Sequence, residues 1–253
     1  MELQSHAALV TGGARRIGRA ISLCLAGAGY AVAIHRNRSE GEAQSLKQEI
    51  ERAGGRCTIL LGDLADDAVA ERLIAEAGKA LGPLTLLVNN ASVFEEDSVA
   101  SLSHERWNRQ MAINLAAPVF LAQAFAAQAP AGRSSIVNVL DQRVFKPTPL
   151  FFSYAVSKAA LHSATHMLAQ ALAPGIRVNG VAPGPTLRST RQSEDDFANQ
   201  SARLPLGRNV SADDVAKAVL YLASADGVTG TVIPVDGGQH IAWQTPEISG
   251  IRE

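Results

Sequence analysis

The stretch TGGARRIG, residues 11–18, decides the fold of this chain. It follows the apolar run AALV and leads into residues with the apolar spacing of an amphipathic helix. A glycine turn between a strand and a helix is typical of a phosphate-binding βαβ unit, because the first N–H groups of the helix have no partner within it. Gly12 permits a tight turn and Gly18 a close approach of the helix to the sheet, although such glycines can also form a turn that binds nothing.

The composition favours an aliphatic core and gives no sign of a nucleic-acid or membrane partner. The 253 residues are 47% hydrophobic but only 5% aromatic, and 23 basic residues stand against 24 acidic ones. The apolar content suffices for a sizeable core. The near-neutral balance lacks the basic excess that nucleic acids and anionic membranes attract. We expect a single domain over residues 1–253.

Cysteine usage and the chain ends indicate a cytoplasmic protein. Cys24 and Cys57 lie far apart, outside any CxxC or metal-ligand spacing, which favours free thiols in a reducing compartment. The N-terminus MELQSHAALVTGG lacks the order of a signal peptide. No apolar run approaches the roughly 18 residues that span a bilayer. His162 and His166 are four residues apart but lack a third ligand, so we expect no metal.

Short apolar runs alternate with longer amphipathic segments along the whole chain. Seven runs are predicted as strands, at residues 7–12, 30–36, 57–63, 84–92, 134–141, 176–184 and 230–238. Helices are predicted at residues 16–28, 40–53, 66–81, 104–128, 153–172 and 212–224. Strands that are apolar throughout suit a parallel sheet covered on both faces. The pattern therefore predicts a Rossmann-type, doubly wound α/β fold with a seven-stranded parallel sheet. Residues 186–205 are predicted as an irregular substrate loop.

The end of the second predicted strand indicates which nucleotide the chain prefers. An NAD site usually carries an acid there, but residues 31–39 contain none. The segment instead supplies His35, Arg36, Arg38 and Ser39, which suit the extra charge of a 2′-phosphate. Arg16 could reach the same phosphate. The segment therefore favours NADPH over NADH, although a solvated charged loop would look alike.

Tyr154 and Lys158 lie four residues apart in the motif YAVSK, and so share one face of a predicted helix. An ammonium beside a phenol favours the phenolate and lowers the pKa of the tyrosine. Such a tyrosine can donate a proton to a carbonyl or imine as hydride arrives. A tyrosine–lysine pair is common by itself, so its weight depends on the motifs around it.

With these motifs in order, the chain resembles the short-chain dehydrogenase/reductase family from Leu9 to Gly238. The matching motifs are TGGARRIG, GDL (62–64), NNAS (89–92), Asn114, Tyr154 with Lys158, PG (183–184) and VTGTVIPVDGG (228–238). The resemblance implies a homodimer or homotetramer, in which the helices at 104–128 and 153–172 pair with a second subunit. It implies a cofactor site formed by Gly12, Arg16, Ile17, Gly18, His35, Arg38, Ser39, Asp63, Leu64, Asn89, Ala91, Tyr154, Lys158, Pro183 and Gly184. It also implies that Asn114 belongs to the proton relay.

Two departures from the family pattern narrow the resemblance. Arg16 stands where the turn usually has glycine, and Asp141 stands where a serine usually precedes the tyrosine by thirteen residues. In both features the chain resembles the pteridine reductases and the bacterial dihydromonapterin reductases, which have an arginine in the turn and use an Asp-Tyr-Lys catalytic set. The segments HRNRS (35–39) and NLAAP (114–118) resemble theirs, and Phe94 occupies their pterin-stacking position.

This resemblance implies a pterin-like substrate and assigns its contacts. Phe94 would stack on the ring, Arg16 would bind its edge, and Ser92 would hydrogen-bond nearby. Asp141 would act as a second acid or as an orienting acceptor beside Tyr154. Each assignment has a plainer alternative: Phe94 can be a loop anchor, Asp141 a capping or salt-bridged carboxylate, and Ser92 a turn residue.

Three functions therefore stay open. The first is an NADPH-dependent pteridine reductase acting on a dihydrobiopterin-, dihydromonapterin- or dihydrofolate-like substrate. The second is a short-chain carbonyl or ketoacyl-type reductase. The third is a cofactor-binding scaffold or sensor without turnover, which the intact Tyr154–Lys158 pair disfavours.

Overall fold

The computed structural model describes residues 6–130, 132, 134–189 and 191–245, and it contains one parallel sheet. The strands are β1 (Ala7–Val10), β2 (Ala31–Arg36), β3 (Cys57–Leu61), β4 (Leu84–Asn89), β5 (Ser134–Val139), β6 (Ile176–Pro183) and β7 (Val232–Val235). The seven strands are ordered β3-β2-β1-β4-β5-β6-β7, and every neighbouring pair is parallel. The predicted fold class is confirmed.

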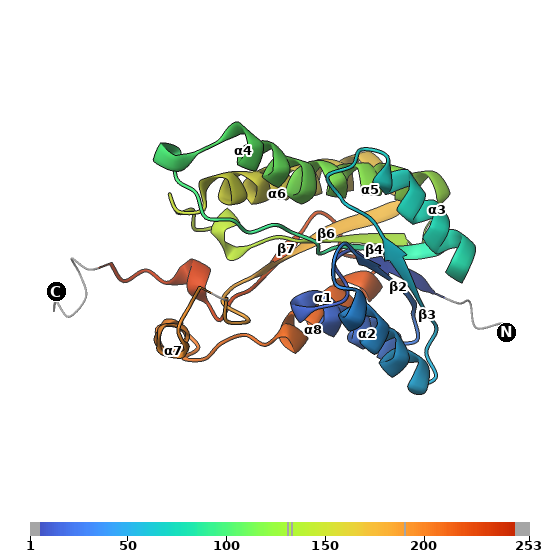
Figure 1. Ribbon diagram of the computed structural model, residues 1–253, viewed down its shortest axis with the longest axis horizontal. Coiled ribbons are helices and arrows are strands. Elements are labelled where there is room, and N and C mark those ends of the chain that lie inside the picture. Colours follow the sequence, from blue (N-terminus) through green and yellow to red (C-terminus); the bar gives the residue numbers. More distant parts are fainter. Residues whose placement is uncertain (1–5, 131, 133, 190, 246–253) are drawn as a thin grey trace.

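Two layers of helices cover this sheet (Figure 1). The helices are α1 (Arg16–Gly27), α2 (Glu40–Arg52), α3 (Val69–Leu81), α4 (His104–Met111), α5 (Ala117–Gln128), α6 (Phe152–Leu172), α7 (Glu194–Ala202) and α8 (Ala212–Ser224). Three short 3-10 turns cover Val99–Ser101, Gln142–Val144 and Gln239–Ile241. Helices α3, α4, α5 and α6 lie on one face, and α1, α2 and α8 on the other (Figure 1).

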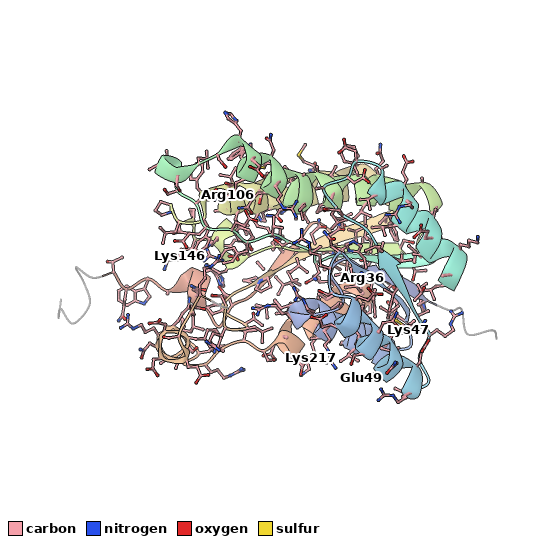
Figure 2. The ribbon with its side chains drawn as sticks, in the orientation of Figure 1. Arg36, Lys47, Glu49, Arg106, Lys146 and Lys217 are labelled. Carbon is pink, nitrogen blue, oxygen red and sulfur yellow. The ribbon has the colours of Figure 1, made fainter. Side chains whose placement is uncertain are left out.

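The residues of β1 alternate between two hydrophobic cores. Ala7 and Leu9 belong to the core beneath α3, α5 and α6, whereas Ala8 and Val10 belong to the core above α1, α2 and α8. All four residues are fully buried. This explains why the strand is apolar at every position, since both of its faces are covered. On the outer surface, Glu49 of α2 forms an ion pair with Arg19 of α1 (Figure 2).

The order of the strands creates a crevice at one edge of the sheet. The chain moves outward from β1 to β3 and then returns to β4 on the other side of β1. The connections after β1 and β4 therefore diverge at their carboxyl ends, which is where open α/β sheets bind ligands. The turn that contains Gly12 lies at this point.

The predicted helix at 104–128 is interrupted at its centre. A π-helical turn, Ala112–Ala116, separates α4 from α5, and Asn114 lies within it. Among the described residues, one helical stretch, His104–Gln128, has the length and the apolar composition that a membrane span requires. This corrects the expectation that no segment reaches that length. In the structure α5 packs against the sheet, with Leu121 and Phe125 fully buried in the core.

The loop predicted as irregular at residues 186–205 contains helix α7. Ser193 caps it, accepting a hydrogen bond from the backbone N–H of Asp196 over 3.0 Å. Acidic residues fill its first turn, where they complement the positive end of the helix dipole. The sequence SEDD carried this N-terminal signal, and the prediction of an irregular segment was wrong for Glu194–Ala202.

Candidate active site

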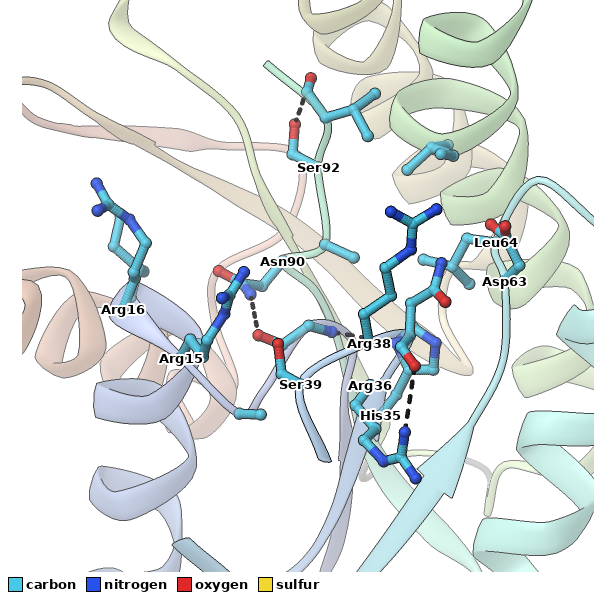
Figure 3. Close-up of a pocket in the computed structure, with 18 of the residues that line it drawn as sticks. Arg15, Arg16, His35, Arg36, Arg38, Ser39, Asp63, Leu64, Asn90 and Ser92 are labelled. Carbon is cyan, nitrogen blue, oxygen red and sulfur yellow. Dashed lines mark hydrogen bonds between the residues drawn. The ribbon is translucent and has the colours of Figure 1, made fainter. Parts of the chain in front are cut away.

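The first of two adjoining cavities has a volume of about 440 Å³ and follows the glycine turn. Its walls come from the segments that follow β1, β2, β3 and β4 (Figure 3), together with Arg109 of α4 and Ile113 of the π-helical turn. The predicted cofactor residues that line it are Gly12, Arg16, Ile17, Gly18, His35, Arg38, Ser39, Asp63, Leu64 and Ala91. Ser92, predicted for the substrate, also lies on this wall.

The glycines of the turn are required by close packing. Gly12 has φ of 60°, a conformation that side chains rarely adopt. A Cβ atom on Gly18 would lie 2.1 Å from the carbonyl oxygen of Gly12, which is shorter than any real contact. Asn90 fixes the same turn through its side-chain amide, which donates to the carbonyls of Thr11 and Gly12.

The backbone conformation of Arg16 is one that glycine adopts more easily than arginine. It has φ of 51°, in the left-handed region that glycine enters freely and other residues enter at a cost. Its guanidinium donates to the carbonyls of Leu187 (3.0 Å) and Arg188 (3.2 Å). Arg16 lines both cavities, so it joins the glycine turn to the loop before α7.

His35 contributes a neutral ring rather than a cation. It is 2% exposed, its Nδ1 accepts from the N–H of Gly12, and its Nε2 lies 3.2 Å from the carbonyl oxygen of Gly62. Burial lowers the pKa of the imidazole from 6.5 to about 4. The interpretation of His35 as a positive charge for a phosphate is therefore wrong, and its ring instead connects the turn to the end of β3.

The cationic side chains around the first cavity differ in whether they are already paired. Arg36 forms an ion pair with Glu40 at 3.5 Å, and Arg15, with a side chain 59% exposed, pairs with Glu42 at 3.5 Å. Within the part of the chain that the structure describes, no hydrogen bond or ion pair involves the side chain of Arg38, and this residue is exposed beside Ser39. Arg38 is therefore a cation available to an anionic ligand.

Asn89 lies away from both cavities. It is 2% exposed, and its amide donates to the Asn138 side chain over 2.9 Å, between β4 and β5. The next residue, Asn90, lines the first cavity instead. Of the other predicted residues, Asp63 accepts from the N–H of Ala65, while Leu64 is buried beside it.

The second cavity has a volume of about 380 Å³, and two of the predicted catalytic residues, Asp141 and Tyr154, line it, whereas the buried Lys158 lines neither cavity. Asp141, Tyr154, Phe94, Pro183 and Gly184 line it, together with Arg16 and Ile17. Tyr154 and Lys158 project from α6, whose first turn is anchored by the buried Asp97. The Asp97 carboxylate accepts from the backbone N–H and the hydroxyl of Ser153.

Tyr154 donates to the carboxylate of Asp141, whose Oδ2 lies 2.9 Å from the phenol oxygen. Burial, followed by Asp141, raises the pKa of Tyr154 well above its usual value of 10. Lys158 donates to the carbonyl of Val139 over 2.7 Å, and burial lowers the pKa of its ammonium to about 8. The predicted lowering of the tyrosine pKa by Lys158 is therefore not found in this structure, because Asp141 and burial act in the opposite direction.

Asp141 also has the features of its plainer alternative. Its Oδ1 accepts from the backbone N–H of Arg143 over 2.9 Å, which caps the 3-10 turn Gln142–Val144. The side chain of Arg143 forms an ion pair with the same carboxylate at 3.0 Å. Asp141 thus combines a cap and a salt bridge with its contact to Tyr154.

Phe94 lies in an aromatic cluster at the second cavity. Its ring stacks on Phe151 with centroids 4.2 Å apart, and it meets the Tyr154 ring edge-on at 4.7 Å. Phe151 has φ of 56° and precedes α6. The guanidinium carbons of Arg143 and Arg191 lie 5.4 and 5.3 Å from the Phe94 centroid.

Asn114 and Ser92 belong to a polar network that connects the wall of the first cavity to α6. The hydroxyl of Ser92 donates to Oδ1 of Asn114 over 3.0 Å, and the Asn114 amide donates to Ser157 over 3.1 Å. Asn114 is fully buried and lines neither cavity. Because Asn114 lies in the π-helical turn, its side chain points toward Ser157 of α6.

Sequence reasoning missed several residues of the second cavity. Arg143 follows Asp141 outside any motif, Phe151 precedes the tyrosine by three residues, and Arg191 lies in the loop before α7.

His162 and His166 contact each other edge-on, with ring centroids 4.8 Å apart. Among the described residues, no group of three or more His, Cys, Asp or Glu side chains is arranged to hold a metal.

Comparison with known proteins identifies the class to which this geometry belongs. The sequence model of the enoyl-(acyl carrier protein) reductase family matches residues 12–240. The uncharacterized oxidoreductase YghA of Escherichia coli K12 is 36% identical over 249 residues, covering 94% of this chain and 84% of that protein. L-rhamnose 1-dehydrogenase (NAD(P)(+)) of Sphingomonas sp. SKA58 is 35% identical over 253 residues, covering 96% of this chain and 99% of that protein.

A solved structure is similar over nearly the whole chain. The FolM alternative dihydrofolate reductase 1 of Brucella canis, crystallised with NADP, has a TM-score of 0.92 and 47% identity. The match covers 96% of this chain and 97% of that one. The fold and the site thus define an oxidoreductase. The chain belongs to the short-chain dehydrogenase/reductase family.

Proposed function

We propose that this protein is an NADPH-dependent reductase of a pterin-like substrate. The observation that carries the proposal is the placement of Asp141, Tyr154 and Phe94 around one cavity, with the phenol 2.9 Å from the carboxylate. The similarity to a FolM alternative dihydrofolate reductase supports the pterin class.

The first cavity fits NADPH. The N-terminus of α1, with Gly12 and Gly18 beside it in the wall of the cavity, suits a diphosphate. Arg38 and Ser39 suit a 2′-phosphate, because Arg38 brings a positive charge that no described residue neutralises. When bound, NADPH supplies the hydride.

The residues of the second cavity would bind the substrate and deliver a proton. Phe94 would contact the flat ring, and Arg16 would bind its polar edge from the junction of the two cavities. Tyr154, kept as a neutral phenol by burial and Asp141, would give its proton to the ring nitrogen beside the reduced carbon. Lys158 would hold the nicotinamide ribose, and Asn114 would support α6 through Ser157.

A carbonyl reductase is the second candidate, because one 35% identical relative is an L-rhamnose 1-dehydrogenase. In that case Tyr154 would protonate a carbonyl oxygen, and Asp141 would serve only to orient the phenol.

The protein is also proposed to form a homodimer or homotetramer. Phe120 on α5 and Met167 on α6 are 52% and 66% exposed, which leaves large apolar side chains on the helices expected to pair.

A crystal structure with NADPH and a dihydropterin tests the substrate class. We expect the pterin ring to lie between Phe94 and the nicotinamide. A ring bound outside the second cavity would contradict the proposal, and so would a complex in which Phe94 makes no contact with it.

A further inference from the structure

Arg143 binds Asp141 through both its backbone and its side chain. The backbone N–H donates to Oδ1 over 2.9 Å, and Nη1 lies 3.2 Å from Oδ1 and 3.0 Å from Oδ2. The 3-10 turn Gln142–Val144 makes this possible, because it folds the chain back toward the end of β5. One residue therefore fixes both oxygens of the carboxylate.

Among the residues that the structure describes, the donors to the Asp141 carboxylate are Arg143 and Tyr154. A carboxylate offers about four acceptor positions. Arg143 makes three of the contacts, and the Tyr154 hydroxyl makes the fourth, at Oδ2. The direction in which Oδ2 faces the phenol is thus set by Arg143.

Arg143 is itself held in place by the aromatic cluster. Its guanidinium carbon lies 5.4 Å from the centroid of Phe94 and 5.6 Å from that of Phe151. The side chains of Arg143 and Asp141 are only 24% and 15% exposed, so solvent screens their ion pair weakly. Asp141 acts to raise the pKa of Tyr154, and Arg143 acts to lower it.

The Tyr154 hydroxyl has one proton, which Asp141 and the substrate must both attract. A carboxylate without a counter-charge would retain that proton more strongly than a carboxylate whose charge is shared with a guanidinium. We propose that Arg143 is a positioning residue that orients Asp141 and shares its charge, so that the Tyr154 proton stays transferable to the substrate. The inference rests on the proposed reductase function but not on the identity of the substrate.

A double-mutant cycle tests this role. The variants are Arg143→Met, Arg143→Lys, Asp141→Asn and the double variant Arg143→Met/Asp141→Asn, assayed with whichever pterin or ketone the unaltered protein reduces. We expect Arg143→Met to lower kcat by ~10- to 100-fold, the range of a perturbed general acid, with a smaller change in KM. In the Asp141→Asn background the same substitution should lower kcat by less than about 3-fold, because its partner is gone. Arg143→Lys should restore part of the rate.

Two controls separate positioning from general damage. Arg191→Met removes the other guanidinium beside Phe94, which does not contact Asp141 in this structure, so its effect should be equal in both Asp141 backgrounds. NADPH affinity and circular-dichroism melts establish that Arg143→Met folds. An equal loss of kcat in both backgrounds, or no loss in either, would overturn the proposal.

A readout without turnover separates this inference from the proposed function. NMR of isotope-labelled tyrosine, with Tyr154→Phe identifying the signal, should show a shift of the Tyr154 ring carbon in Arg143→Met. The same substitution should leave that signal unchanged in the Asp141→Asn background. If no substrate is reduced but this pattern is found, the reductase function fails and the coupling stands. If the signal does not respond to Arg143→Met, the coupling fails.

Discussion

The Tyr154 hydroxyl donates to Oδ2 of Asp141 over 2.9 Å. This contact, together with burial, keeps the tyrosine protonated and therefore able to act as an acid. The Lys158 ammonium lies over the Tyr154 ring, 5.9 Å from its centroid, and donates its hydrogen bond to the carbonyl of Val139 rather than to the phenol oxygen. The site is thus organised around a carboxylate and a phenol, with the lysine behind them.

Replacing the proton donor should abolish catalysis and spare binding. Tyr154→Phe removes the hydroxyl but keeps the ring against Phe94, so we expect kcat to fall ~10²- to 10⁴-fold. NADPH affinity, measured by fluorescence titration, should change by less than about 2-fold, since the phenol proton serves chemistry rather than binding. A loss of NADPH affinity as large as the loss of rate would argue against a proton-donor role.

Removing the Arg38 side chain should change cofactor preference. The side chain of Arg38 has no partner among the described residues and lies beside Ser39 in the first cavity, so Arg38→Ala should weaken NADPH binding ~10- to 100-fold, the range of a charged hydrogen bond. NADH binding should change little, because it lacks the 2′-phosphate. Arg15→Ala is the matched control, since Arg15 already pairs with Glu42. An equal loss of affinity for NADPH and NADH would show that Arg38 does not contact the 2′-phosphate.

The buried ammonium of Lys158 should make stability depend on pH. Its pKa is lowered from 10.5 to about 8, so below pH 8 folding must bury a charge. Between about pH 8 and 10.5 the unfolded chain holds more protons than the folded one, and stability from this group rises with pH. The difference in Tm, taken as the unaltered protein minus Lys158→Met, should therefore increase as pH rises through this window. The exposed Lys217→Met serves as control, and parallel Tm curves for the Lys158 variant would contradict the assignment.

The left-handed conformation of Arg16 can be tested with two variants. Arg16→Met keeps a side chain at φ of 51° but loses the bonds to Leu187 and Arg188, whereas Arg16→Gly loses the bonds and relieves the strain. The free energy of unfolding of the glycine variant should exceed that of the methionine variant by ~1 kcal/mol. Both variants should be cleaved faster by protease near Arg188 than the unaltered protein. Equal unfolding free energies would show that the backbone there is not strained.

Periodic and local features were predictable from the sequence. The seven strands were predictable because each contains a short apolar run between amphipathic segments, and Gly12 and Gly18 because no side chain fits at the turn. The π-helical turn at Asn114 was not, since it continues the apolar pattern of the helices around it.

Site residues were predictable only where a motif marks them. Asp141 and Tyr154 stand at a spacing that the family shares, and the structure brings them into contact. Arg143 and Phe151 have no such mark, because their positions follow from a 3-10 turn and a left-handed residue. His35 was misread as a cation, since its charge depends on burial that the residue type does not reveal.

We propose that the Asp141–Tyr154 pair serves reduction of a pterin. The most direct test is NADPH oxidation by the purified protein with dihydrobiopterin, dihydromonapterin and dihydrofolate, beside a panel of ketones. We expect kcat/KM for at least one of these pterins to exceed that for every ketone. We also expect Asp141→Ser to lower the pterin value more than any ketone value. Turnover of a ketone without turnover of any pterin would contradict a pterin-reductase function.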